Sequence, residues 1–423
     1  MDRRAFLHSA AALPWLRGAT GPLAGLGTAT VAVAAAPADN RYRRLLVLVE
    51  LKGGNDGLNT LVPFADPAYY ALRPKIAIAR DQAVQLSDRA GLHPALAPLA
   101  PLWKDERLAV LQGVGYPEPN LSHFRSIEIW DTASRSEDYL QDGWLTRAFA
   151  AAPVPGAFAA DGVVVGTNDL GPLAGGRTRA LAIADTAQFL RRARLAQTAA
   201  ATPNRALAHI LKVESDIVQA ASHLDAKVEL ATAFPRNAFG NAVKTAARIA
   251  ANPSGVAVVR VTLNGFDTHA NQVATQARLL AELADGLVAL RAALVEIGKW
   301  DDTLVLTYAE FGRRPKENQN GGTDHGTANV HFALGGRVAG GLYGTAPDLT
   351  RLSADGNPAH ALDFRAVYAT VLERWWGADS RDALGGRFAP MLTPFGSAYT
   401  PGANSVSSVM IIPSDGITLR FIG

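Results

Sequence analysis

Two short segments in the C-terminal third of this chain place acids and imidazoles close together. In the first, Asp267 and His269 are separated by one threonine. In the second, Glu310 stands ahead of His325, which lies in a glycine-flanked run at 321–326. Carboxylate and imidazole ligands suit Zn²⁺ or Mn²⁺, whereas an all-oxygen site would suit Mg²⁺ or Ca²⁺. The residue types and their spacing therefore indicate a metal site.

Each of these residues also has a simpler interpretation. Asp267 could cap the start of a helix and leave His269 in solvent. His325 could be a hydrogen-bonded loop histidine, and Glu310 could pair with one of the arginines that follow it. The metal interpretation therefore depends on the groups converging in the fold.

A third acid, Asp56, follows Gly53 and Gly54, a setting in which aspartate is also a common turn former. Asp56, Asp267 and Glu310 each come after an apolar run typical of a buried strand, at 44–51, 256–263 and 303–309. The carboxyl ends of parallel strands share one edge of the sheet, so we expect the three acids to converge there. Their mutual repulsion is relieved if a divalent cation lies between them.

Ser122 is the candidate nucleophile, at the predicted start of a helix after the strand pattern 108–114. A serine there also commonly acts as the N-cap. A helix N-terminus favours an anionic transferring group, and a nearby metal would lower the pKa of the hydroxyl. The adjacent His123 and Arg125 could bind an oxyanion or could be surface groups.

The elements that would position these residues alternate along the chain. Further strand patterns occupy 161–166 and 329–335, and helical spacing occurs at 93–103, 274–297 and 363–376. This alternation predicts an α/β protein with a doubly wound, mainly parallel sheet that helices cover on both faces. Alanine-rich helical patterns between about 184 and 251 predict a helical insertion that caps the sheet. We expect His331 to stand behind the site, and structural roles for His93, His209, His223 and His360.

Residues 1–36 indicate a twin-arginine signal peptide, with Arg3 and Arg4 ahead of an apolar stretch rich in alanine and glycine. Pro14 and Arg17 interrupt the stretch, so we expect no stable membrane anchor. These features predict export by the twin-arginine translocase to the periplasm or beyond. The remaining residues 37–423 are then a single domain, whose length suffices for a large core.

Composition excludes several classes of protein. Residues 1–36 hold three of the 41 lysines and arginines and one of the 38 aspartates and glutamates, which leaves a formal charge near +1. No basic stripe indicates nucleic-acid binding. The chain has no cysteine and three methionines, so neither disulfides nor a soft-ligand redox site is predicted.

Several blocks of sequence resemble an exported bacterial family known as domain of unknown function 1501. They are the twin-arginine leader, ELKGGNDGLN, NLSHFRS, GFDTHANQ, EFGRRPKENQNGGTDHGTANVHFALGG and DFRAVYATVLERWWG. That family is regarded as a distant relative of the alkaline phosphatase/sulfatase superfamily. The resemblance implies an alkaline phosphatase-like fold around one or two divalent metal ions, with zinc favoured and manganese, magnesium or calcium as alternatives.

The resemblance also implies roles for the individual residues. One metal would be held by Asp267, His269 and His325, and a second would be surrounded by Asp56, Glu310 and Ser122. Two positions depart from the superfamily pattern, since only Thr268 separates the first acid from its histidine and Phe311 takes the place of an imidazole. Without cysteine, and without the sulfatase pattern at Ser122, formylglycine chemistry is not supported.

The function predicted is a periplasmic metal-dependent hydrolase of a phosphate or other anionic ester, small or polymeric. Its nucleophile would be a serine or a metal-bound hydroxide. The alternative is a non-catalytic exported binding or assembly protein on a degenerate hydrolase scaffold, working with another exported protein.

Overall fold

β1 (Leu45–Lys52) is a continuous apolar strand whose side chains enter two separate cores. Val47 and Val49 pack in one core, and Leu46 and Leu48 pack in the other. Successive side chains of a strand point to opposite faces, so a strand that is apolar throughout needs cover on both sides. The predicted burial of this strand on two faces is confirmed.

The central sheet is mixed and mainly parallel. In the described part of the chain its strand order is β13-β5-β12-β9-β1-β8-β6-β7, and β14 pairs with β5. β12 runs antiparallel to β5 and β9, while the pairs of β1 with β8 and β9 are parallel. The strands after β1 are β2 (Leu61–Val62), β3 (Val84–Gln85), β4 (Gly91–Leu92), β5 (Leu108–Gly115), β6 (Ala160–Val165), β7 (Ala180–Ile183), β8 (Val256–Asn264), β9 (Thr303–Tyr308), β10 (Gly312–Arg313), β11 (His325–Gly326), β12 (Asn329–Leu334), β13 (Gly341–Gly344) and β14 (Leu362–Asp363).

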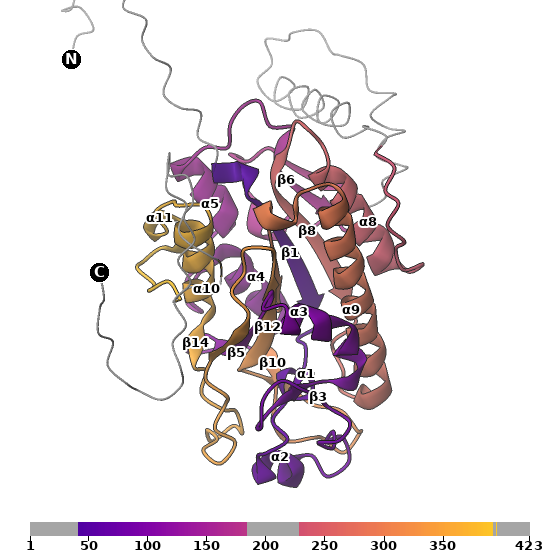
Figure 1. Cartoon of the computed structure of the whole chain (residues 1–423). Coiled ribbons are helices and arrows are strands. Elements are labelled where there is room, and N and C mark those ends of the chain that lie inside the picture. The colour runs from indigo at the N-terminus through magenta and orange to yellow at the C-terminus, as the bar shows by residue number, and fades with distance from the viewer. Residues whose placement is uncertain (1–40, 184–227, 392–394, 396–423) are drawn as a thin grey trace, which may run out of the picture. The chain divides into compact units, whose positions relative to one another are not determined.

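Helices cover both faces of this sheet, as Figure 1 shows. Residues of α3, α8 and α9 belong to the first core, and residues of α4, α5, α10 and α11 belong to the second. The helices are α1 (Gly57–Thr60), α2 (Pro67–Leu72), α3 (Ala100–Lys104), α4 (His123–Thr132), α5 (Trp144–Ala151), α8 (Ala238–Ala250), α9 (Gln272–Glu296), α10 (Phe364–Thr370) and α11 (Arg381–Leu384). The doubly wound α/β class predicted from the alternating pattern is confirmed.

Helical spacing in the sequence did not always give a regular α-helix. The predicted helix at 93–103 is a 3₁₀ segment, Pro94–Leu99, followed by α3. Its three prolines lack the N–H groups that a continuous α-helix would use. The predicted helix at 363–376 is α10 followed by a π-helical turn, Val371–Trp375.

The computed structural model describes residues 41–183, 228–391 and 395. The predicted signal peptide and residues 184–227 of the predicted insertion lie outside the described residues. The later part of that insertion contains α8, whose buried face packs with β8 and α9 in the first core. α8 is therefore a member of the helical layer on the sheet.

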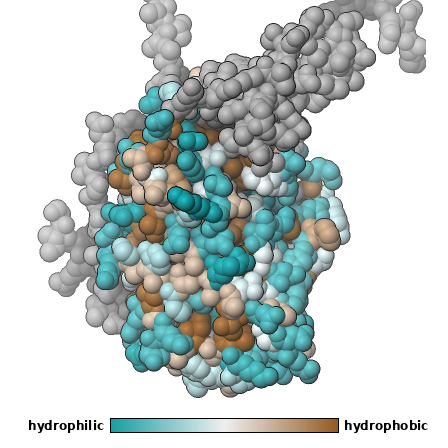
Figure 2. Space-filling view, turned by 90° about the vertical axis from the view of Figure 1, so that its right-hand side faces the viewer, coloured by the Kyte–Doolittle hydropathy of each residue, from teal (hydrophilic) through white to brown (hydrophobic). Residues whose placement is uncertain are grey.

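None of the helices in the described ranges combines the length and the apolar character needed to cross a membrane. Figure 2 shows the molecule from the side on which α9 lies in Figure 1, and hydrophilic residues are interspersed there with smaller hydrophobic groups. α9 has its buried leucines on one side and exposed Val273 and Val295 elsewhere.

Candidate metal centre

Three loops meet at the carboxyl edge of the sheet because their strands are neighbours. β9, β1 and β8 are adjacent and parallel, so the segments after them leave the sheet at the same edge. The backbone N–H of Gly53, after β1, donates to Oε1 of Glu310, after β9, at 2.9 Å. The predicted convergence of these strand ends is confirmed.

The buried guanidinium of Arg313 joins these loops. It donates to the carbonyls of Gly53, Gly54 and Phe266, and Nη2 also donates to Oδ1 of Asp267 at 2.7 Å. Arg313 is fully buried, whereas the side chain of Asp267 is 46% exposed. Arg313 therefore supplies part of the positive charge that balances the carboxylate of Asp267.

Asp267 is the centre of a histidine cluster. The ligand atoms of His123, Asp267 and His325 lie within 4.8 Å of one another. Oδ1 of Asp267 is 3.2 Å from Nε2 of His325, and Oδ2 is 3.4 Å from Nε2 of His123. A third imidazole, His269, places Nε2 at 3.0 Å from Oδ1. Metal–ligand bonds of about 2.0–2.2 Å separate tetrahedral ligands by roughly 3.3–3.5 Å, so these spacings fit a single cation.

The other ring nitrogen of each histidine is held from behind. Nδ1 of His123 donates to Oε1 of Glu310 at 2.9 Å, and Nδ1 of His325 donates to the carbonyl of Leu121 at 2.7 Å. Nδ1 of His269 lies 3.2 Å from Oδ1 of Asp324. A ring with its proton on Nδ1 presents an unprotonated Nε2, and metal-binding histidines are oriented in this way.

Two of these nitrogens face each other directly. Nε2 of His269 is 2.9 Å from Nε2 of His325. If Nδ1 carries the proton in both rings, two lone pairs meet at this distance, which is unfavourable. A shared proton or a cation between the rings removes the repulsion, and the carboxylate of Asp267 stabilises either one.

The charges around the cluster suit metal binding at neutral pH. Partial burial acts to raise the pKa of Asp267, but the hydrogen bond and charge of Arg313 lower it to about 2, so the carboxyl is ionised. Burial lowers the pKa of His325, with Arg313 adding to the effect, so this imidazole is neutral. The hydrogen bond to Glu310 raises the pKa of His123, so at this ring a metal must compete with a proton.

Glu310 contacts the cluster through His123. Its carboxylate is 2% exposed, and Oε1 accepts from both Gly53 and His123. Oε2 is buried and has no hydrogen-bond partner in the described residues. Glu310 was predicted to bind the metal directly, but the structure places it as the group that orients His123. The ring of Phe311 packs against His123 and His325, with ring centroids 4.8 and 4.5 Å away.

Asp56 is not brought to the cluster. Its carboxylate forms a buried two-point ion pair with Arg73, at 2.5 and 3.0 Å, and Oδ2 also accepts from Gln272. Oδ1 caps α1 by accepting from the N–H of Leu58. Because Arg73 already neutralises this acid, the placement corrects the prediction that Asp56 holds a metal and supports its simpler role in a turn.

Ser122 and Arg125, two of the predicted catalytic residues, have different surroundings. Ser122 is the N-cap of α4, yet its exposed hydroxyl makes no cap hydrogen bond, and its neighbours Leu121 and His123 both contribute to the cluster. Arg125 is 8% exposed and donates to the carbonyls of Arg135, Ser136 and Asp138. Its donors are used inside the protein, which corrects its predicted role in binding an oxyanion.

Two functional assignments were missed from the sequence. His123 was predicted as an oxyanion group, but the structure places it among the candidate metal ligands. Asp324, which holds His269, was overlooked although it precedes His325 directly. His331 lies buried against Trp130 with neither ring nitrogen bonded, so nothing in the described structure ties it to the cluster.

Comparison with solved structures finds weak similarity. The lipoteichoic acid synthase LtaP from Listeria monocytogenes is 10% identical, with a TM-score of 0.34 and coverage of 85% of this chain and 76% of that one. The C-terminal periplasmic domain of EcEptC from Escherichia coli, in complex with Zn, is 13% identical, with a TM-score of 0.32 and coverage of 69% of this chain and 72% of that one. The alkaline phosphatase from the Antarctic bacterium TAB5 is 11% identical, with a TM-score of 0.30 and coverage of 71% of this chain and 94% of that one. The chemistry of the site is therefore inferred from this chain's own residues.

No curated protein shows a significant sequence match to this chain. A family model with the description "Protein of unknown function (DUF1501)" matches residues 109–384, a range that includes every residue of the histidine cluster. The chain therefore belongs to the DUF1501 family.

Proposed function

We propose that this protein is an exported, metal-dependent hydrolase of a phosphate or other anionic ester, acting in the periplasm or outside the cell. The observation that carries the proposal is the shared direction of three imidazoles, since Nε2 of His123, His269 and His325 all face Asp267. The cluster is open to solvent, because the side chains of Asp267 and His269 are 46% and 44% exposed. A substrate can therefore reach it.

His123, Asp267 and His325 would hold one divalent cation and leave a coordination position for substrate or water, with His269 beside them. The nitrogen and oxygen donors suit zinc or manganese. A cation bound there would supply a Lewis acid that stabilises negative charge on the ester oxygens. The ion pair of Asp56 with Arg73 argues against a second ion at that carboxylate.

The residues around the cation site have defined tasks. Ser122 presents a hydroxyl with no hydrogen bond to the described residues, at the N-terminus of α4, where free backbone N–H groups favour an anion. Phe124, 90% exposed beside His123, offers an apolar surface to the alcohol part of an ester. These features support binding of an anionic ester with its reacting centre near Ser122.

Either the Ser122 hydroxyl or a water molecule supplies the attacking oxygen. In the serine route this oxygen bonds to phosphorus while the alcohol leaves with the electron pair of the broken P–O bond and takes up a proton. Water then releases phosphate from the serine and restores its proton. In the water route the same displacement occurs in one step.

The test is turnover of activated esters by the full chain, purified after export and supplied with zinc or manganese. We expect hydrolysis of at least one of 4-nitrophenyl phosphate, bis(4-nitrophenyl) phosphate and 4-nitrophenyl sulfate. His325→Ala should lower kcat/KM by about tenfold or more. Ser122→Ala abolishes turnover in the serine route and spares it in the water route, while Ser136→Ala is the control serine.

A second function is favoured by one observation. Because Arg73 already neutralises Asp56, where a second cation would be expected, the chain fits a non-catalytic binding or assembly protein that uses its metal structurally. Stoichiometric metal with no turnover of the three esters would contradict the hydrolase proposal and support this alternative.

A further inference from the structure

A cavity of about 320 Å³ lies between the α1–β2 segment and strands β12 and β13. Its walls include Leu58, Leu61, Val330 and Leu342, so most of the surface that a ligand would meet is apolar. Small-molecule sites in proteins have volumes of about 300–1,000 Å³ and combine apolar walls with a few polar groups. The cavity lies at the lower end of that range.

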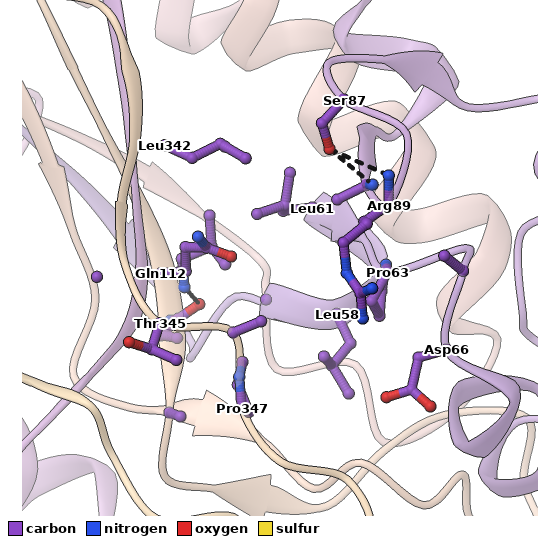
Figure 3. Close-up of a pocket in the computed structure, with 18 residues that line it drawn as sticks. Leu58, Leu61, Pro63, Asp66, Ser87, Arg89, Gln112, Leu342, Thr345 and Pro347 are labelled. Atoms are coloured by element: carbon purple, nitrogen blue, oxygen red, sulfur yellow. Dashed lines mark hydrogen bonds between the residues drawn. The ribbon is translucent and has the colours of Figure 1, made fainter. Parts of the chain in front are cut away.

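Gln112, on β5, is an unpartnered polar group in this cavity. Its side chain is 9% exposed and makes no hydrogen bond with the described residues. Figure 3 shows Gln112 and Leu342 on the wall opposite Ser87 and Arg89, with the amide of Gln112 turned into the cavity. An amide in largely apolar surroundings is stabilised when water or a ligand bonds to it.

Arg89 brings a positive charge to the opposite wall. Figure 3 shows its side chain extending along the cavity toward Leu58. Within the described part of the chain its guanidinium forms no ion pair and no hydrogen bond. Asp66 also lines the cavity, but Oδ1 of its carboxylate accepts from the N–H of Ala68 as the cap of α2. Arg89, whose side chain is exposed, is therefore the cationic group that this cavity offers to an anion.

We propose that this cavity binds a small carboxylic acid with an apolar body and a hydroxyl group at its far end. The carboxylate pairs with Arg89, the apolar body fills the space among the leucines, and the hydroxyl bonds to the amide of Gln112. A hydroxylated aromatic acid has this chemistry. The positions of Arg89 and Gln112 on opposite walls match a ligand with polar groups at its two ends.

The cavity is a separate site from the histidine cluster. Asn329 lines the cavity and its amide donates to the carbonyl of Phe311 at 2.8 Å. The ring of Phe311 packs on His123 and His325. Asn329 and Phe311 thus stand between the two sites, and binding in the cavity needs neither a metal nor the hydrolase activity.

The test is calorimetric titration of the full chain with 3-(4-hydroxyphenyl)propionate. We expect saturable one-to-one binding, weakened roughly tenfold by Gln112→Leu and roughly tenfold by Arg89→Gln. Arg135→Gln, which removes an exposed arginine elsewhere, should leave the affinity unchanged. His325→Ala should also leave the affinity unchanged, because that variant alters the histidine cluster and not the cavity.

Two analogues test the same contacts on the unmodified protein, which keeps the proposal testable if Gln112→Leu does not fold. 3-Phenylpropionate lacks the hydroxyl, and 3-(4-hydroxyphenyl)propionamide lacks the charge, so each should bind roughly tenfold more weakly. The proposal is overturned if the acid does not bind saturably, if neither analogue binds more weakly, or if His325→Ala abolishes binding.

Discussion

The proton on each clustered histidine decides what the cluster can bind. Leu121 offers only a carbonyl to His325, so Nδ1 of that ring must donate and Nε2 is left as a ligand atom. Glu310 has the same effect on His123. A carboxylate behind an imidazole also raises the basicity of the ligand nitrogen. Glu310 would therefore act on a bound metal through His123.

Replacing Glu310 by alanine should weaken zinc binding by about 10- to 100-fold, because His123 loses the group that orients it. Zinc titration of the metal-stripped protein measures the effect. Glu317→Ala is the matched control, since Glu317 is also a carboxylate that accepts backbone N–H groups, those of Lys75 and Ile76. Equal zinc affinity in both variants and the unmodified protein would contradict the role of Glu310.

At this scale the sequence predicted the meeting of Asp267, His269 and His325 but not the distribution of the remaining charges. Asp56 and Arg73 are 17 positions apart, and no pattern of residue types marks them as a buried pair. Arg125 is two positions after His123 in the sequence, yet its guanidinium donates to three backbone carbonyls and takes no part in the cluster. Such choices depend on tertiary contacts that spacing alone does not contain.

At the scale of elements, tight loops after the strands bring the acids to the cluster. Gly53 has φ of 114°, and a Cβ there would lie 2.4 Å from the backbone nitrogen of Asp267. The loop after β1 can therefore pass the loop after β8 only with glycine at this position. The close approach fixes the backbone that carries Asp267.

Gly53→Ala should destabilise the protein by about 1–3 kcal/mol and weaken zinc binding, because the loop of Asp267 must move. Urea unfolding and zinc titration measure the two effects. Gly176→Ala is the control, since a Cβ at Gly176 meets nothing within 4 Å and its φ is not positive. A Gly53 variant as stable and as tight in zinc binding as the control would disprove the argument.

The sequence predicted the elements that carry the cluster well, because strands buried on both faces have continuous apolar runs. β1, β8 and β9 match their predicted ranges within two residues. The antiparallel direction of β12 was not predicted, because an apolar run has no direction. The change to a π-helical turn after α10 likewise has no signal in the spacing of apolar residues.

For the whole molecule, two cores on opposite faces of one sheet stabilise the fold, and one of them contains a buried imidazole. His331 on β12 is 2% exposed, and neither ring nitrogen has a hydrogen-bond partner among the residues that the structure describes. Burial lowers its pKa to about 3, from an ordinary value of 6.5. The folded protein therefore holds this ring neutral at pH values where the unfolded chain protonates it.

This difference makes stability depend on pH. The contribution of neutral His331 is complete above pH 6.5 and is lost as the pH falls from 6.5 toward 3, with a slope of about 1.4 kcal/mol per pH unit. Between pH 7 and pH 5 the unmodified protein should thus lose about 2 kcal/mol more stability than His331→Leu. Urea unfolding at both pH values measures it.

His360→Leu provides a comparison, since burial also lowers the pKa of that imidazole but the ring is only half-buried. Its effect on the pH dependence should be smaller. If the unmodified protein and His331→Leu lose equal stability between pH 7 and pH 5, the ring is not held neutral in the fold.

Anomalous X-ray scattering from a crystal of the zinc-loaded full chain tests the metal centre most directly. We expect one strong zinc peak about 2.0–2.2 Å from Nε2 of His123, from Nε2 of His325 and from a carboxylate oxygen of Asp267. Asp56 should remain paired with Arg73. A cluster without a peak, in protein that binds zinc elsewhere or not at all, would contradict the account.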